Sequence, residues 1–288
     1  MPQLTKAPVP APKAAAGVAV VQTTPTQMET TIRPMHTADL PAVAALHPTA
    51  AAPLLAHVRW CLHTPYATAL VLVHANAILG VATVVRFGTS AQVGRFHIHP
   101  AHQRQGLGTL LWHAVVAQHT AQHMPILLHC DPRILAFWER QGLVEQCAFS
   151  TYANGLFQEA TRDEVAIMQP HHTLALLRLD QRATGEDRSM LLMEHHYAGQ
   201  AYVEGGHVRG VLLPILGNGY IVADAPEVGL ELQRWLLPTQ HRIAVPELNT
   251  PANEHLLDRD YDVVGTTVRI VWGTPPHFDP QLVFAWPW

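Results

Sequence analysis

The residues with the clearest capacity for chemistry are 99–109, which read His-Pro-Ala-His-Gln-Arg-Gln-Gly-Leu-Gly-Thr. The preceding stretch Gln92–His99 has the composition of a strand, and the apolar positions of Gly106–His123 recur every three or four residues, as in a helix. Unpaired backbone N–H groups at such a helix start favour an anion, which the helix dipole also attracts. Gly106 and Gly108 lack a Cβ and would let phosphate oxygens approach the backbone. The stretch therefore predicts a phosphate-binding loop.

Two better-known phosphate loops are excluded by this spacing. No Gly-Lys-Ser or Gly-Lys-Thr follows the glycines, as a Walker loop requires, and the GxGxxG pattern of dinucleotide sites is absent from the stretch. The alternative is a helix that merely begins with two flexible glycines.

The stretch Gln103-x-x-Gly106-x-Gly108 after His99-Pro100 resembles the coenzyme A signature of the GNAT acetyltransferases. Downstream, Ile134–Leu143 (ILAFWERQGL) resembles the second signature of that family, and about 30 residues with one expected helix and one expected strand separate the two. The resemblance covers roughly residues 31–155. It implies an N-acyltransferase that uses acetyl-CoA or another acyl-CoA, with direct attack of a primary amine on the thioester.

The resemblance also implies roles for individual positions. The backbone of the strand end would pair with the pantetheine arm, the loop would hold the pyrophosphate, and two aromatic residues would line the acyl end. The residues concerned are Phe96, His97, Ile98 and His99 for the strand, Gln103, Arg104, Gln105, Gly106, Leu107, Gly108 and Thr109 for the loop, and Phe137 and Trp138 for the acyl end.

Two departures from the family pattern concern catalysis. Trp138 stands where the family often has a tyrosine acid, and an indole N–H is no useful acid near neutral pH. The strand before the loop offers Gly94, Arg95 and His97 where many members have a glutamate, so we expect His97, Asp131 or a water-linked residue to take the proton. Two alternatives remain open: a protein that binds acyl-CoA without catalysis, and an enzyme of the same fold with a longer acyl donor.

The second half of the chain resembles the C-terminal domain of bacterial tandem GNAT proteins, through Asp180–Arg188 and Pro246–Asn249. No coenzyme loop follows residue 160; its equivalent would lie near Asp224–Gly229. We therefore expect a degenerate GNAT-like domain that covers the amine site. Its residues Glu186, Asp187 and Arg188 are candidates for binding a cationic substrate. The alternative is structural, with Thr184 capping a helix and Asp187 and Arg188 paired on its surface.

These patterns predict an α/β, layered fold of two GNAT-like domains, each with a mixed, mostly antiparallel central sheet flanked by helices. The division is a flexible tail at 1–30, a GNAT domain at 31–157, a linker at 158–173 and a degenerate domain at 174–288. Expected strands are Thr31–Met35, Ala69–Val73, Leu79–Phe87, Gln92–His99, Pro125–Cys130, Leu174–Leu179, Gln200–Glu204, Val208–Ile215, Gly219–Ala223, His241–Val245 and Thr266–Trp272. Expected helices are Leu40–Ala45, Pro53–Leu62, Gly106–His123, Pro132–Gln141, Gly185–His195, Pro226–Leu236 and Thr250–Arg259.

Composition limits the partners. The 288-residue chain has a formal net charge of -4 without a Lys/Arg cluster, so we expect neither nucleic acid nor membrane as a partner. Three cysteines without a CxxC motif favour a reducing, cytoplasmic location, although the apolar run Ala14–Val21 faintly resembles a signal peptide. His97/His99 and His119/His123 lack a third ligand at known spacing, and no metal is expected. The expected partner is a small-molecule or peptide amine held between the domains of a monomer or homodimer.

Overall fold

The computed structural model describes residues 30–119 and 124–287. The expected tail at 1–30 therefore falls almost wholly outside the described residues, as do the last four residues of the expected helix Gly106–His123. No helix within the described ranges is long and apolar enough to cross a membrane.

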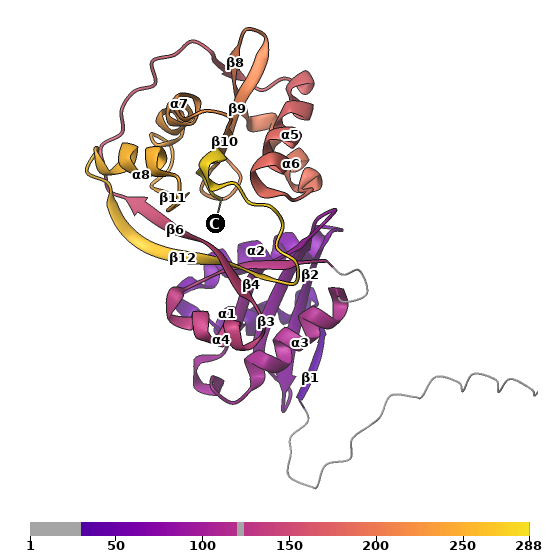
Figure 1. Cartoon of the computed structure of the whole chain (residues 1–288). Coiled ribbons are helices and arrows are strands. Elements are labelled where there is room, and N and C mark those ends of the chain that lie inside the picture. Colours follow the sequence, from indigo (N-terminus) through magenta and orange to yellow (C-terminus); the bar gives the residue numbers. More distant parts are fainter. Residues whose placement is uncertain (1–29, 120–123, 288) are drawn as a thin grey trace, which may run out of the picture.

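An eight-stranded sheet, most of which lies in the lower half of Figure 1, has the strand order β1-β2-β3-β4-β5-β12-β6-β11. Only β4 and β5 run parallel; all other neighbours are antiparallel. The strands are β1 (Thr30–Pro34), β2 (Ala67–His74), β3 (Ala77–Arg86), β4 (Ala91–Ile98), β5 (Ile126–Cys130), β6 (Val144–Ala153), β11 (Arg242–Pro246) and β12 (Asp262–Trp272). The helices are α1 (Leu40–Ala45), α2 (Ala51–His63), α3 (Leu107–His119) and α4 (Leu135–Arg140).

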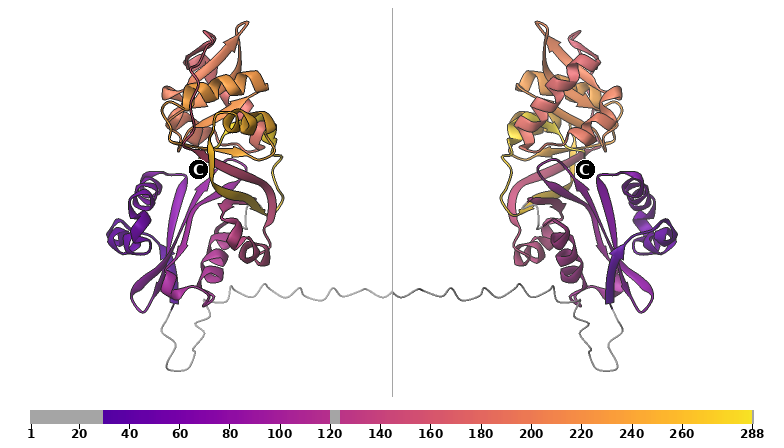
Figure 2. Two further views of the ribbon diagram at one scale, coloured as in Figure 1. Left: turned by 90° about the vertical axis from the view of Figure 1, so that its left-hand side faces the viewer. Right: turned by 90° about the vertical axis from the view of Figure 1, so that its right-hand side faces the viewer.

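Helices cover both faces of this sheet, as the side views in Figure 2 show. Side chains that alternate along a strand point to opposite faces, and β3 follows this rule. Its Val81 packs with α1 and α2, whereas Ala82 and Val84 pack with the helix pair α3 and α4. The sheet is thus buried on both faces around β3 and β4, the strands that precede the phosphate-loop candidate.

The second half of the chain builds a five-stranded sheet in the order β13-β10-β9-β8-β7. Helices again cover both faces: α5 and α6 contribute to one core, and α7 and α8 to the other. The strands are β7 (Val165–Ile167), β8 (Gln200–Glu204), β9 (His207–Leu213), β10 (Tyr220–Ala223) and β13 (Val283–Ala285). The helices are α5 (Thr173–Thr184), α6 (Ser189–His195), α7 (Pro226–Leu236) and α8 (Thr250–Leu257). The predicted fold class is confirmed: an α/β, layered fold with two mostly antiparallel sheets, each flanked by helices.

The C-terminal half contributes two strands to the large sheet. β12, from the C-terminal half, inserts between β5 and β6, and β11 pairs with β6 at the edge of the same sheet. In Figure 1 the long yellow strand β12 runs beside β6 across the junction of the halves. A division of the chain at 158–173 does not foresee this arrangement, because pairing between strands that are far apart in the sequence leaves no local signal.

Most of the expected elements are present, and three differences are informative. The expected strand Leu174–Leu179 is wrong: these residues belong to α5, since a short apolar run does not distinguish a strand from a buried helix. Gly185 does not start the next helix but ends α5 in the left-handed conformation, with φ +69°, and α6 begins at Ser189. Strand β6 was not expected at all.

Candidate acyl-CoA site

Strands β4 and β5 separate in the middle of the large sheet. Their parallel pairing covers only Ala91 to Val93 on β4 and ends at the pair Val93–Leu128. Beyond this point the strands line a cavity of about 170 Å³. Its walls are Val93, Gly94, Arg95, Phe96 and His97 of β4, Leu128, His129 and Cys130 of β5, and Asp131, Ile134 and Trp138 from the segment that follows. The unpaired edge of β4 is therefore open to a ligand that enters between two strands.

The loop after β4 has the geometry that its sequence predicts. Arg104 and Gly106 adopt positive φ angles of 61° and 81°, and α3 begins directly afterwards at Leu107. Within the described part of the chain, the backbone N–H groups of residues 105–109 have no acceptor. They lie at the N-terminus of a 13-residue helix, where backbone dipoles attract an anion.

Glycine at position 108 keeps this loop close to α4. A Cβ there would lie 3.3 Å from the ring of Phe137, so the space above the helix start is already narrow. Gln103 tightens the loop from the other side, because its Nε2 donates to the carbonyl oxygen of Ile98 over 3.1 Å. The loop is thus fixed to the end of β4 and beside the aromatic residues of α4.

Aromatic side chains close the inner end of the cavity. Trp138 is buried and contacts Phe96, Trp112 and Phe137 edge-to-face, with ring centroids 5.0, 5.3 and 4.8 Å apart. Its Nε1 is shielded from solvent and has no hydrogen-bond partner among the described residues. Trp138 therefore combines a role in the core with one wall of the cavity, and its one donor faces no protein acceptor.

The two base candidates from the sequence have different surroundings. His97 is partly buried on β4 next to His47, and burial lowers its pKa to about 4, with His47 and Arg95 adding to the effect. Asp131 accepts from the backbone N–H of Arg133 and forms a salt bridge with its guanidinium, which lowers the carboxyl pKa to about 2. His97 is therefore neutral at pH 7, whereas Asp131 is an ionised but weakly basic group.

Three further polar side chains gather at this end of the sheet, and the sequence analysis assigned no role to any of them. Arg95 and His129 line the cavity, and Nε2 of His57 on α2 lies 3.0 Å from the hydroxyl of Thr83. Burial lowers the pKa of His57 to about 4 and that of His129 well below its usual value. Strict alternation along β5 would place His129 and Leu127 on the face opposite Leu128, which is the only sequence signal for His129.

Glu186, Asp187 and Arg188 do not form one surface patch. Glu186 is buried and accepts from Ser90 and from Arg269, over 2.6 and 2.9 Å. Arg188 is also buried and pairs with Asp180 rather than with Asp187. Exposed Asp187 accepts from the N–H of Ser189 at the start of α6. Two of the three residues are therefore unable to meet a substrate, and the expected surface pair of Asp187 with Arg188 is wrong.

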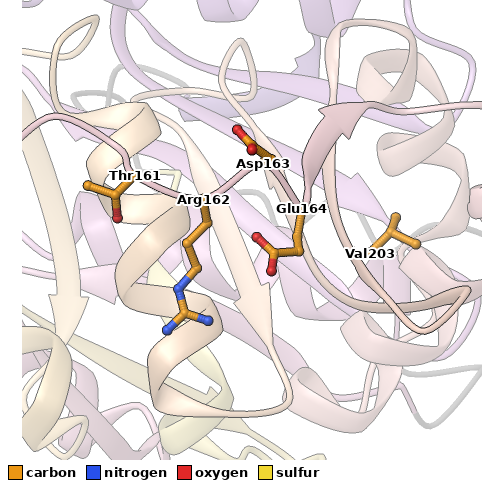
Figure 3. Close-up of a pocket in the computed structure, with 5 residues that line it drawn as sticks. All are labelled: Thr161, Arg162, Asp163, Glu164 and Val203. Carbon is orange, nitrogen blue, oxygen red and sulfur yellow. The ribbon is translucent and has the colours of Figure 1, made fainter.

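A second pocket, about 640 Å³ in volume, lies in the second half of the chain. Figure 3 shows that Thr161, Arg162, Asp163 and Glu164 of the connecting segment, together with Val203 of β8, line it. Arg162 donates to the hydroxyl of Tyr202, and its backbone N–H donates to Glu231. We assign no chemistry to this shallow polar surface.

The second half lacks a phosphate loop at the expected position. Asp224 precedes α7 and Glu227 lies in its first turn, and both carboxylates contact Arg209. Gly229 is packed against Phe284, whose ring atoms lie 2.3 Å from the position of a Cβ. Negative charge and tight packing at this helix start leave no place for a pyrophosphate. Among the described residues, no group of three His, Cys, Asp or Glu side chains is arranged to hold a metal ion.

Comparisons with known proteins agree with this geometry. Residues 49–157 match the family model "Acetyltransferase (GNAT) domain". No curated protein matches the sequence. A solved structure of a candidate acetyltransferase from Pyrococcus horikoshii is similar with a TM-score of 0.75 at 16% identity, covering 94% of this chain and 98% of the other.

Two further structures extend over both halves of the chain. A GCN5-related N-acetyltransferase from Sphaerobacter thermophilus has a TM-score of 0.59 at 16% identity, covering 88% of this chain and 98% of the other. A tandem GNAT protein from the clavulanic acid biosynthesis pathway has a TM-score of 0.54 at 14% identity, covering 86% of this chain and 100% of the other. At these identities the likeness establishes the fold alone. Residues 49–157 thus match the model of a GNAT acetyltransferase domain, and both halves of the chain share the fold of these structures.

Proposed function

We propose that this protein transfers an acetyl group from acetyl-CoA to the nitrogen of a small primary amine. One observation carries the proposal: the opening between β4 and β5 leads directly from unpaired N–H groups at the start of α3 to an aromatic-lined cavity. A pyrophosphate at residues 103–109 and a pantetheine arm along 96–99 would place a thioester at that cavity.

The cavity size favours a short acyl group. Its volume is about 170 Å³. Trp138 is held in place by three aromatic neighbours, so a long acyl chain could enter only by displacing well-packed rings. This supports acetyl-CoA over the longer donors that the sequence leaves open.

The reaction requires modest help with proton transfer. The amine nitrogen bonds to the carbonyl carbon, the C–S bond breaks, and the nitrogen loses the proton that the thiolate finally gains. A thiol has a pKa of about 8.5, so the thiolate leaves without a strong acid, and the absence of an acidic hydroxyl at Trp138 is tolerable. We assign deprotonation to neutral His97, because the nitrogen becomes more acidic once it is bonded to the carbonyl carbon.

The full-length protein should bind acetyl-CoA with a dissociation constant on the order of micromolar to millimolar, the common range for enzyme substrates. Calorimetric titration measures binding, and thiol release over an amine panel measures transfer. Binding without release by any amine would favour a protein that only binds acyl-CoA. Absence of binding for acetyl-CoA and free coenzyme A would refute the proposed site.

Replacing His97 with Gln should lower kcat about tenfold or more, since general bases contribute roughly 10²–10⁴ in rate. The pKa of His97 is lowered to about 4, so its neutral form persists at all pH values above that. Between pH 6 and 9 the wild-type rate should therefore follow the ionisation of the amine substrate rather than that of an imidazole.

The matched control is His113→Gln, on the exposed face of α3, which should leave kcat unchanged. Unchanged kcat in His97→Gln across pH 6–9 would remove His97 from the mechanism. Calorimetry with acetyl-CoA separates a loss of chemistry from a loss of donor binding.

A further inference from the structure

Arg95 occupies an irregular point of β4. The pairing register with β3 shifts between Thr83 and Val84, so that Gly94 has no partner in the ladder. The backbone N–H of Arg95 donates instead to the hydroxyl of Thr83 over 2.8 Å. Bulges of this kind redirect a side chain, and here the side chain of Arg95 lines the cavity where the acyl group is expected.

The guanidinium of Arg95 has no hydrogen bond or salt bridge to any side chain within residues 30–119 and 124–287. Arg95 is partly buried, and burial lowers its pKa. This is unusual because an arginine withdrawn from water is normally paired with a carboxylate. The contrast inside the same molecule is clear: the buried Arg188 and Arg269 each have a carboxylate partner.

The surroundings of Arg95 offer no competing anion. His57 and Cys61 face it from α2, and burial holds the imidazole neutral and raises the pKa of the thiol to about 12. On the cavity wall His97 and His129 are neutral imidazoles, and the one carboxylate, Asp131, is already bound to Arg133. The site thus presents one unneutralised cation among neutral hydrogen-bonding groups.

We propose that the acetyl acceptor is a small amine that also carries a carboxylate, and that Arg95 binds this carboxylate. The inference rests on the proposed function and names its substrate class. A guanidinium matches a carboxylate with two parallel hydrogen bonds, which fixes the orientation of the bound molecule. The amine, a few bonds from that carboxylate, then lies beside His97 and the thioester, on the face of β4 opposite the loop helix α3.

The test uses pairs of acceptors that differ only in charge. Each of a panel of free amino acids is compared with its own carboxamide in the thiol-release assay at saturating acetyl-CoA. The wild type should prefer the carboxylate member by about 10- to 100-fold in kcat/KM, the range for a lost hydrogen bond to a charged group. Arg95→Gln should abolish this preference, mainly through a higher KM, and leave the affinity for acetyl-CoA unchanged. Arg95→Lys should retain part of this preference, because lysine keeps the positive charge but cannot form two parallel hydrogen bonds with the carboxylate.

Arg86→Gln is the matched control, since this exposed arginine at the end of the neighbouring strand β3 carries the same charge outside the cavity. It should leave the preference intact. Equal use of both members of each pair by the wild type, or a preference for the carboxamide, overturns the inference while the transferase function stands. A preference that persists in Arg95→Gln assigns the carboxylate to another residue and equally overturns it. Failure of every amine despite bound acetyl-CoA removes the proposed function itself.

Discussion

Asp180→Asn is expected to lower the free energy of unfolding by about 3–5 kcal/mol, the usual cost of removing one partner from a buried ion pair. Asp180 on α5 and Arg188 are both almost fully inaccessible to solvent and form a salt bridge. The hydroxyl of Tyr220 donates to the same carboxylate over 2.6 Å. Without that negative charge, the guanidinium of Arg188 would remain buried between the rings of Tyr220 and Trp286, each 4.8 Å away.

Thermal unfolding followed by circular dichroism measures the effect. At roughly 2–4 °C per kcal/mol for chains of this size, the midpoint should fall by roughly 6–20 °C. Asp187→Asn is the neighbouring control and should change stability by less than about 1 kcal/mol, because the amide oxygen of asparagine can accept the same hydrogen bond from the N–H of Ser189. The double variant Asp180→Asn with Arg188→Met should recover much of the loss, since it removes both charges. If the double variant is destabilised as much as Asp180→Asn alone, lost packing rather than the unpaired charge accounts for the loss of stability.

Buried contacts at the junction of the two halves predict that the halves unfold together. One hydrophobic core contains Val85 and Phe149 from the large sheet together with Leu192, Val211 and Trp286 from the second half. The buried contacts of Glu186 with Ser90 and Arg269 cross the junction as well. Because β12 also lies within the large sheet, separation of the halves would expose apolar surface and unpaired strand edges on both.

The sequence predicts the parts of the site that depend on local chemistry. The loop at 103–108 and the helix end at Gly142, with φ +84°, follow from glycine positions and helical periodicity. The Pro226–Leu236 helix also has the expected bounds. Each of these features is decided by residues within a few positions of one another.

What the sequence leaves out depends on contacts between distant segments. Glu186 and Arg188 look like surface charges, and only the fold supplies the partners Arg269 and Asp180 that bury them. The sequence places Arg95 on the strand before the loop, but only the folded structure shows that its guanidinium pairs with no side chain among the described residues. The insertion of β12 into the first sheet also depends on distant segments, so no short stretch of sequence predicts it.

Thr109→Glu is expected to weaken acetyl-CoA binding by about 10- to 100-fold. Thr109 is the third residue of α3, and its own N–H is one of the unpaired groups of the loop. A carboxylate there would place a negative charge next to the position that we assign to the pyrophosphate. Two unit charges about 5 Å apart repel by roughly 3 kcal/mol at an effective dielectric constant of 20.

The same substitution should not harm the fold, which makes it a sharp test of the loop. A negative charge in the first turn of a helix stabilises it by roughly 0.3–1 kcal/mol through the helix dipole. Thr109→Gln controls for size and for the weak hydrogen bond from Gln141, 3.4 Å long, that both variants lose. Calorimetric titration of the two variants with acetyl-CoA isolates the charge. Equal affinities of the two variants for acetyl-CoA would place the pyrophosphate elsewhere. Weaker binding by Thr109→Glu than by Thr109→Gln, with undiminished thermal stability, would assign the pyrophosphate to the start of α3.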